Sequence, residues 1–262
     1  MISYFFEEIG RISLLTKAVF VLLVRSIIEK RFIKFENFRP IFTPTTRRIV
    51  YHLVNIGVNT LPILFVVSGF FGMVLAYLGY NQFRRIEMEI YTGALVGTSM
   101  LTEVGPVIAA VLIAGRIGSQ ASAEISSMKT TQQIDALETL AVNPIEYLVL
   151  PRFIATVLMM PVLGIFADAI GIMGGYVVGV LMFGLKSELY ITKMLDFLKV
   201  SDLTYGLIKT IFFGAIIIII SCYKGFRAKE GAVGVGEATT SAVVVSIAVV
   251  LVADYFLTVI LF

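Results

Sequence analysis

Four ionisable side chains lie within long apolar stretches of the sequence, where a charge needs a physical explanation. Glu103, Asp168, Lys209 and Asp254 each stand in a run long enough to cross a bilayer. A charge at such a position costs about 2.5–3.5 kcal/mol on insertion scales, so each residue needs a partner or a water-filled cavity. Lys209 and Asp254 lie roughly 9 and 12 Å from one end of their runs at about 1.5 Å per residue, and this similar depth favours an ion pair between them. The sequence indicates no firm partner for Asp168.

Glu103 is followed by two helix-breaking residues in the segment LTEVGPV. Proline has no backbone N–H, so Pro106 leaves the carbonyl of Thr102 without its usual donor. A broken helix with a carboxylate at membrane depth is tolerated only where it lines protein or a water-filled cavity. Glu103 is therefore either a cavity residue with a functional role or part of a structural kink.

The sequence offers no group of residues suited to catalysis or metal binding. His52 is the single histidine and Cys222 the single cysteine, which leaves no metal cluster and no nucleophile–base pair. The segment Gly179–Ser187, GVLMFGLKS, is one residue out of register with a phosphate-binding loop. We therefore expect a non-catalytic protein with no metal and no cofactor, which does not hydrolyse ATP itself.

Composition predicts an all-α integral membrane protein built around these residues. Hydrophobic residues make up 58% of the 262 positions, charged residues 15%, and the mean hydropathy is +0.94, values typical of membrane chains. A single domain, 1–262, is expected, with an interfacial (elbow) region at 1–52 and a five-span region at 53–262. The predicted spans are Val54–Gly79, Tyr91–Ala114, Phe153–Leu185, Leu203–Tyr223 and Ala238–Phe262.

The segments outside these spans are shorter and more polar. Residues Ile12–Ile28 carry Lys17 and Arg25 and are predicted to form a helix lying in the membrane interface. The apolar side chains that this helix would bury are Leu14, Leu15, Val19, Leu22 and Leu23. A basic stretch follows, in which Pro40 and Pro44 prevent one continuous helix. Lys186–Asp202 is mildly amphipathic, and Lys224–Glu237 is predicted to be a glycine-rich charged loop.

The distribution of positive charge predicts the orientation in the membrane. Five spans place the two termini on opposite sides. The side that holds the N-terminus has fifteen Lys and Arg residues, and the other side has five. The positive-inside rule therefore predicts a cytoplasmic N-terminus and an outer C-terminus. The net charge of +3 follows from this topology and does not indicate a nucleic-acid partner.

Glycine spacing predicts close helix contacts on two spans. Gly171, Gly175 and Gly179 recur every fourth residue on the third span, and Gly93 and Gly97 repeat the pattern on the second. Such spacing lets helix backbones approach closely in membranes. For the second pair, the general abundance of glycine in membrane helices accounts for the spacing equally well.

The polar segment Gly115–Arg152 lies between the second and third spans, on the predicted cytoplasmic side. Its first half is rich in small residues. Thr130 or Thr131 is predicted to cap a helix that runs to about Val142, before Asn143-Pro144. One side of this helix would carry Ile134, Leu137, Leu140 and Ala141, and the other Gln132, Asp135, Glu138 and Thr139. It is either a linker helix resting on the membrane or a docking surface, and its acidic face favours a protein partner over anionic lipid.

The run from Gly105 to Ala155 closely resembles the MlaE-type permeases of bacterial lipid-transport ABC systems. The shared pieces are E-x-G-P, AGR-x-GS-x2-SAEI-x2-M, QIDALE and NP-x5-LPR. The resemblance continues through the glycine-rich third span, LIKT around Lys209, the GVG-x2-TT loop at Gly234–Thr240 and the last span with Asp254. It covers nearly the whole chain and is weakest over residues 1–50.

The resemblance implies a homodimeric inner-membrane permease bound to a cytoplasmic ABC ATPase dimer and a periplasmic MCE-domain hexamer, in some systems with a STAS-domain protein. The implied substrate is a phospholipid, exchanged with the MCE shuttle to supply or maintain the outer membrane. The segment Thr130–Val142 would be the coupling helix. The residues expected to contact the ATPase are Glu124, Gln133, Ile134, Asp135, Leu137 and Glu138. The residues expected to line a lipid pocket are Leu75, Leu78, Phe83, Glu103 and Val107.

Other classes of function stay open from the residues. An importer of sterols or other lipids belongs to the same family. An ion-coupled secondary transporter would use Glu103, Asp168 and Lys209 as a proton relay, but five spans without an inverted repeat argue against it. An intramembrane enzyme lacks a nucleophile–base pair. A scaffold for the MCE ring would need the same surfaces as a transporter.

Overall fold

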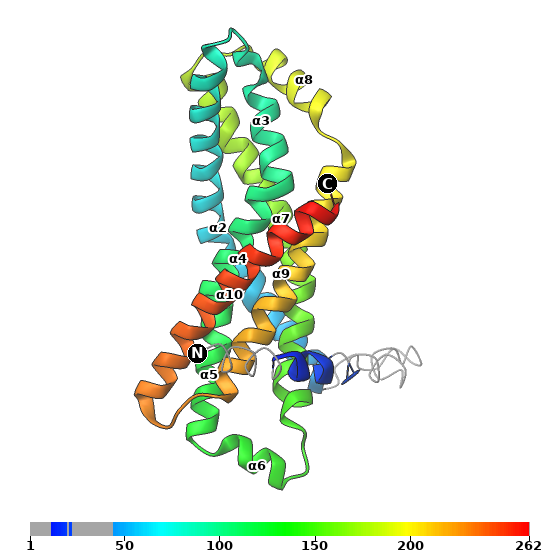
Figure 1. Ribbon diagram of the computed structural model, residues 1–262, viewed down its shortest axis with the longest axis vertical. Coiled ribbons are helices and arrows are strands. Elements are labelled where there is room, and N and C mark those ends of the chain that lie inside the picture. Colours follow the sequence, from blue (N-terminus) through cyan, green and yellow to red (C-terminus); the bar gives the residue numbers. More distant parts are fainter. Residues whose placement is uncertain (1–11, 20, 23–43, 262) are drawn as a thin grey trace. The chain divides into compact units, whose positions relative to one another are not determined.

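The computed structural model describes residues 12–19, 21–22 and 44–261, and the described residues form helices and turns with no strand among them (Figure 1). Residues 12–19 are helical. The remaining elements are, in chain order, α2 (Pro44–Arg84), η1 (Glu89–Tyr91), α3 (Thr92–Ser99), η2 (Met100–Val104), α4 (Gly105–Ile113), η3 (Ala114–Gly118), α5 (Ser119–Thr130), α6 (Gln133–Thr139), η4 (Ile145–Val149), α7 (Leu150–Tyr176), η5 (Val177–Met182), α8 (Ser187–Phe197), α9 (Val200–Phe226) and α10 (Gly231–Leu261).

Five helical stretches of the described chain are long and apolar enough to cross a membrane, which confirms the predicted all-α membrane class. They are Thr46–Arg84, Glu89–Thr130, Ile145–Met182, Val200–Phe226 and Gly231–Leu261. Each starts earlier than the predicted span. A bilayer-length apolar run sets only the minimum length of a helix, which continues into polar sequence until a turn stops it.

Two predicted boundaries were wrong for this reason. The small-residue half of the polar segment is helical, because η3 and α5 continue the second span to Thr130. The segment Lys224–Glu237 is not a long loop, since α9 runs to Phe226 and α10 begins at Gly231. Gly231 adopts a φ of 85°, which reverses the chain within a few residues and is a conformation that glycine adopts without strain.

The amino-terminal region is described only in part. Val19 is buried, whereas Leu14 exposes 66% of its surface. Leu23 and Pro40 lie outside the described residues. Pro44 begins α2, in the first helical turn where a missing N–H costs nothing. The predicted break at Pro44 is therefore a helix start.

By their contacts, the described residues fall into two compact units. Unit 1 holds the described residues up to Ile56 together with Ile113–Leu158 and Gly214–Val249. Unit 2 holds Gly57–Leu112, Met159–Phe213 and the described residues from Val250 onward. The four ionisable residues of the predicted spans, Glu103, Asp168, Lys209 and Asp254, all belong to unit 2.

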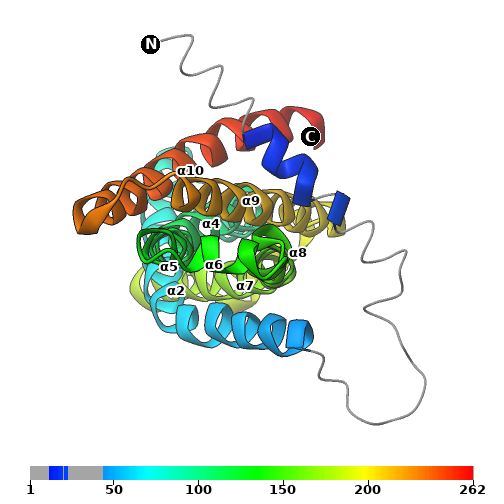
Figure 2. The same ribbon diagram turned by 90° about the horizontal axis from the view of Figure 1, so that it is seen from below.

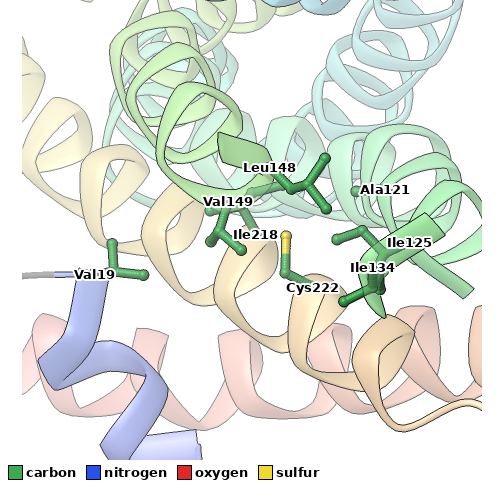
Figure 3. Close-up of a cluster of buried hydrophobic side chains, with 8 residues drawn as sticks. All are labelled: Val19, Ala121, Ile125, Ile134, Leu148, Val149, Ile218 and Cys222. Atoms are coloured by element: carbon green, nitrogen blue, oxygen red, sulfur yellow. The ribbon is translucent and has the colours of Figure 1, made fainter. Parts of the chain in front are cut away.

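Unit 1 has an apolar core around the buried thiol of Cys222 (Figure 3). Figure 3 shows the thiol between side chains of α5 and side chains of η4, and the cluster also includes Val19 and a residue of α6. The members of this Cys222 core are Val19, Ala121, Ile125, Ile134, Leu148, Val149, Ile218 and Cys222. The core attaches the short helix α6 to the membrane helices.

Unit 2 is held together by glycines at helix contacts. A Cβ on Gly72 of α2 would overlap the backbone of Gly171 on α7, so these two helices touch through their main chains. Gly93 and Gly179 both face the ring of Tyr190 on α8, which packs beside α3 (Figure 1). Burial raises the pKa of the Tyr190 phenol to about 12, so it is neutral. Both predicted sets of spaced glycines therefore lie at close contacts.

Candidate functional site

Glu103 lies in a π-helical turn of unit 2, Met100–Val104, between α3 and α4. The N–H of Gly105 donates to the carbonyl of Met100, five residues back. Pro106 has no N–H, and the carbonyl of Thr102 accepts a hydrogen bond from Lys209 Nζ at 3.1 Å instead. A lysine of α9 thus supplies the donor that the helix lacks, and this bond places its ammonium group beside Glu103.

Lys209 is the centre of a charged cluster that α9, α10 and the π-turn build together. Its side chain is fully buried, and Nζ contacts Glu103 Oε2 as well as Asp254 Oδ1 at 3.0 Å. Nζ also donates to Thr258 Oγ1 at 2.7 Å. That hydroxyl lies 2.9 Å from Glu103 Oε1 and 2.8 Å from the backbone carbonyl of Asp254. We call Thr102, Glu103, Lys209, Asp254 and Thr258 the Lys209 cluster.

An apolar cleft of about 380 Å³ adjoins this cluster within unit 2. Glu103 is its single ionisable residue, and the other lining side chains come from α2 and the helix that follows Glu103. The lining residues are Val67, Phe71, Glu103, Val104, Val107, Ile108, Val111 and Leu112. A cleft of this size and composition is typical of sites that bind apolar molecules.

The structure brings together two of the five residues predicted for a lipid pocket, Glu103 and Val107. Leu75 instead packs against a core cluster around Met100, and 56% of Leu78 is exposed. Phe83 lines a separate cleft of about 490 Å³ beside Tyr91. Sequence reasoning missed Val67, Phe71, Val104, Ile108, Val111, Leu112 and Thr258. Helical spacing from Glu103 points to several of these, and Thr258 stands one helical turn after Asp254.

Asp168 does not join the Lys209 cluster in the contacts that the structure records. It is 4% exposed, and its Oδ1 has no hydrogen-bond partner within the described chain. That oxygen occupies the space where a side chain on Gly105 would begin. Asp168 therefore explains why residue 105 is glycine, and it packs against the residue that follows the turn of Glu103.

Unit 1 contains a second charged cluster, centred on Arg152 at the start of α7. Arg152 Nη2 donates to Glu124 Oε2 at 2.7 Å, and Gln120 Nε2 donates to Glu124 Oε1 at 2.8 Å. Asn55 Nδ2 of α2 reaches Gln120 Oε1 at 3.3 Å. A cavity of about 20 Å³ adjoins them and is also lined by His52. We call Asn55, Gln120, Glu124 and Arg152 the Arg152 cluster; within it, Glu124 already has a partner in the chain.

Helix α6 connects the end of α5 with the stretch leading into α7 (Figures 1 and 2). Its predicted cap and end were wrong. Thr131 closes α5 by donating to the carbonyl of Ser127 at 2.8 Å, and Gln132, at a φ of 58°, precedes the first turn of α6. The helix ends at Thr139, because Ala141 adopts a φ of 56° and turns the chain away.

The faces of α6 differ in chemistry. Ile134 is buried in the Cys222 core and Leu137 packs against it, so these two residues hold α6 in place. Gln133, Asp135 and Glu138 do not belong to that core, and Gln133 and Asp135 are exposed. Leu140, expected on the packed side, is 73% exposed because it follows the end of the helix. The side of α6 away from the core is therefore acidic with one apolar residue at its edge.

The fold and these sites define a membrane protein with an acidic helix outside its spans and a charged cluster beside an apolar cleft. Among the described residues, no three His, Cys, Asp or Glu side chains gather as metal ligands would. The chain belongs to the MlaE permease family, since residues 49–260 match the family described as permease MlaE.

Similar proteins occur in several bacteria. A probable ABC transporter permease of Rickettsia typhi is 44% identical over 214 residues, which cover 82% of this chain and 83% of that protein. The intermembrane phospholipid transport system permease protein MlaE of Haemophilus influenzae is 41% identical over 208 residues, covering 79% and 80%. A probable ABC transporter permease of Synechocystis is 36% identical over 207 residues, covering 79% of both chains.

Proposed function

We propose that the chain is the membrane subunit of an ABC transporter that moves phospholipid between the bacterial inner membrane and a periplasmic MCE-domain shuttle. Family membership and the name of the Haemophilus influenzae relative support this proposal. The structural observation that carries it is the two-sided helix α6. Its apolar side chains are anchored in the Cys222 core, and its acidic side chains lie outside that core.

A separate cytoplasmic ATPase dimer supplies the energy in this proposal, because the sequence holds no phosphate-binding loop in register. The surface that receives the ATPase consists of Gln133, Asp135, Glu138 and Leu140. A cluster of acidic residues with one exposed apolar side chain suits a basic groove with an apolar pocket. A STAS-domain protein would bind to the ATPase in some systems of this type.

The chain acts as a homodimer in the inner membrane, with its N-terminus in the cytoplasm and its C-terminus in the periplasm. The charge distribution supports the orientation. Uneven burial supports an external partner for two of the helices. Within the most apolar stretch of each span, the share of residues buried by the rest of the chain is 11% for α10 and 22% for α2. It is 44–50% for the other three spans. These exposed faces are available to lipid, to a second copy and to the MCE hexamer.

Coupling runs through the helical stretch Glu89–Thr130. It is continuous from the turn of Glu103 to the end of α5, shortly before α6. Two π-helical turns interrupt its regular geometry, at Met100–Val104 and Ala114–Gly118, and such turns are frequent at functional sites. Closure of the ATPase dimer would push on α6, and the motion of this helix with α2 and α10 would expel a lipid from the cleft beside Glu103.

Reversing the charge of the docking helix tests this function. In the variant Asp135→Lys/Glu138→Lys, ATPase affinity should fall more than about tenfold, because like charges would face a basic groove. Co-purification of the ATPase and lipid-stimulated ATP hydrolysis measure this loss. The matched control is Glu87→Lys/Glu237→Lys, which makes the same change in charge on residues outside α6. Unchanged coupling in the α6 variant would contradict the docking role.

A further inference from the structure

The predicted spans carry more acidic than basic groups within unit 2. They hold three carboxyl groups there, Glu103, Asp168 and Asp254, and a single ammonium group, Lys209. Two of the carboxylates contact Lys209 directly. The Lys209 cluster therefore carries one formal negative charge in excess when its members are ionised. Excess charge of one sign inside a membrane span favours a ligand group of the opposite sign.

Lys209 itself is not available to a ligand. An ammonium group has three N–H donors, and those of Lys209 face the carbonyl of Thr102, the hydroxyl of Thr258 and the carboxylate of Glu103. The side chain is fully buried. A lipid phosphate near this cluster would therefore meet carboxylate groups and no accessible cation.

Glu103 is the accessible member of the cluster. Its side chain is 41% exposed, compared with 16% for Asp254 and 0% for Lys209. It also lines the apolar cleft of about 380 Å³. A carboxylate offers about four lone-pair sites, and the contacts from Lys209 and Thr258 use two of them. Glu103 can therefore accept further hydrogen bonds from a ligand whose chains occupy the cleft.

We propose that Glu103 binds the primary ammonium group of an ethanolamine-type zwitterionic phospholipid whose acyl chains lie in the adjacent cleft. This inference rests on the proposed transport function and adds the headgroup class. A primary ammonium group donates hydrogen bonds to the carboxylate, whereas a choline group offers only charge, and a glycerol headgroup leaves the lipid with a net negative charge. The order of preference is therefore phosphatidylethanolamine, then phosphatidylcholine, then phosphatidylglycerol.

The test uses the full transporter complex, purified and placed in vesicles with equal amounts of these three lipids. After re-extraction in detergent, mass spectrometry measures which lipids stay bound. The wild type should be enriched in phosphatidylethanolamine over phosphatidylglycerol relative to the vesicle. Glu103→Gln should reduce this enrichment about tenfold, since a charge-assisted hydrogen bond is replaced by a neutral one. Glu103→Asp, which keeps the charge, should retain part of the enrichment.

Glu87→Gln is the matched control. Glu87 is exposed and does not line the cleft, so the enrichment should stay at the wild-type value. An enrichment that survives in Glu103→Gln, or a wild type whose bound lipids mirror the vesicle, would overturn the ammonium site while leaving phospholipid transport intact. Absence of any bound phospholipid in the wild type would count against the proposed function as well.

Discussion

The Lys209 cluster and the Arg152 cluster contain similar types of residue, but they differ in the number of carboxylates that each cation faces. Each sets a buried cation against a glutamate of the helical stretch Glu89–Thr130, and the two glutamate side chains are almost equally exposed, 41% for Glu103 and 42% for Glu124. Arg152 faces one carboxylate, which the amides of Gln120 and Asn55 support. Lys209 lies between two carboxylates.

The free space beside the two clusters also differs, and it is larger at the Lys209 cluster. The cavity at Arg152 is about 20 Å³, enough for one water molecule, whereas the cleft at Glu103 is about 380 Å³. A balanced pair with little free space can join helices but has no room for a ligand. An unbalanced cluster beside an apolar cleft keeps bonding capacity for one. The difference favours stabilisation as the role of the Arg152 cluster and binding as the role of the Lys209 cluster.

Removing the cation should have its largest effect where two carboxylates depend on it. Lys209→Met keeps the approximate volume but leaves Glu103 and Asp254 facing each other, with no donor for the carbonyl of Thr102. We expect a loss of about 3–5 kcal/mol in the free energy of unfolding, the usual cost of breaking a buried pair. Denaturation in mixed detergent micelles measures it.

The matched change in the other cluster, Arg152→Met, should cost about 2 kcal/mol, because it leaves a single, partly exposed carboxylate. Equal losses of unfolding free energy in Lys209→Met and Arg152→Met would contradict the proposed difference between the two clusters. Adding Glu103→Gln and Asp254→Asn to Lys209→Met should restore most of the stability, since a neutral cluster leaves no uncompensated charge.

The two π-helical turns of the stretch Glu89–Thr130 extend the comparison to the backbone. Gly105→Ala would force its Cβ against Asp168 and the carbonyl of Met100, so we expect a destabilisation of about 2 kcal/mol. Gly115→Ala in the other turn meets no atom within 4 Å and should change stability by no more than about 0.5 kcal/mol. Thermal denaturation in detergent measures both variants.

Shortening the opposing side chain provides the control. If the overlap with Asp168 is the cause, Asp168→Ser should recover at least half of the loss in a Gly105→Ala background. A Gly105→Ala protein as stable as Gly115→Ala would mean that the turn of Glu103 is not held by this contact.

The sequence predicts the membrane class well, because apolar runs of bilayer length are rare in water-soluble proteins. It also directs attention to Lys209 and Asp254, since charges inside such runs need partners. That Glu103 shares the same ammonium group depends on which helix faces meet. Leu75 and Leu78 lie on α2, a different helix from the one that carries Glu103, so a helical period counted within one helix does not place them relative to Glu103.

Local backbone conformation limits the prediction of α6 in a similar way. Gln132 and Ala141 both have positive φ values, which neither residue type favours. The chain adopts them because burial of Ile134 in the Cys222 core fixes the position of the helix. Only the packed structure contains this information, so the sequence misplaces both ends of α6 while correctly indicating its acidic face.

The hydroxyl groups at the two clusters should show the smallest difference. Thr258 accepts a hydrogen bond from Lys209 and lies 2.9 Å from Glu103, whereas Thr156 donates to the carbonyl of Arg152 at 2.8 Å. Thr258→Val should cost about 1.5 kcal/mol in unfolding free energy, since its bonds involve charged groups, and Thr156→Val about 0.5 kcal/mol. Detergent denaturation of both variants measures the difference. A larger loss of unfolding free energy in Thr156→Val than in Thr258→Val would mean that the Thr258 hydroxyl does not stabilise the excess charge of the Lys209 cluster. Solvent in the cleft would then screen that charge instead.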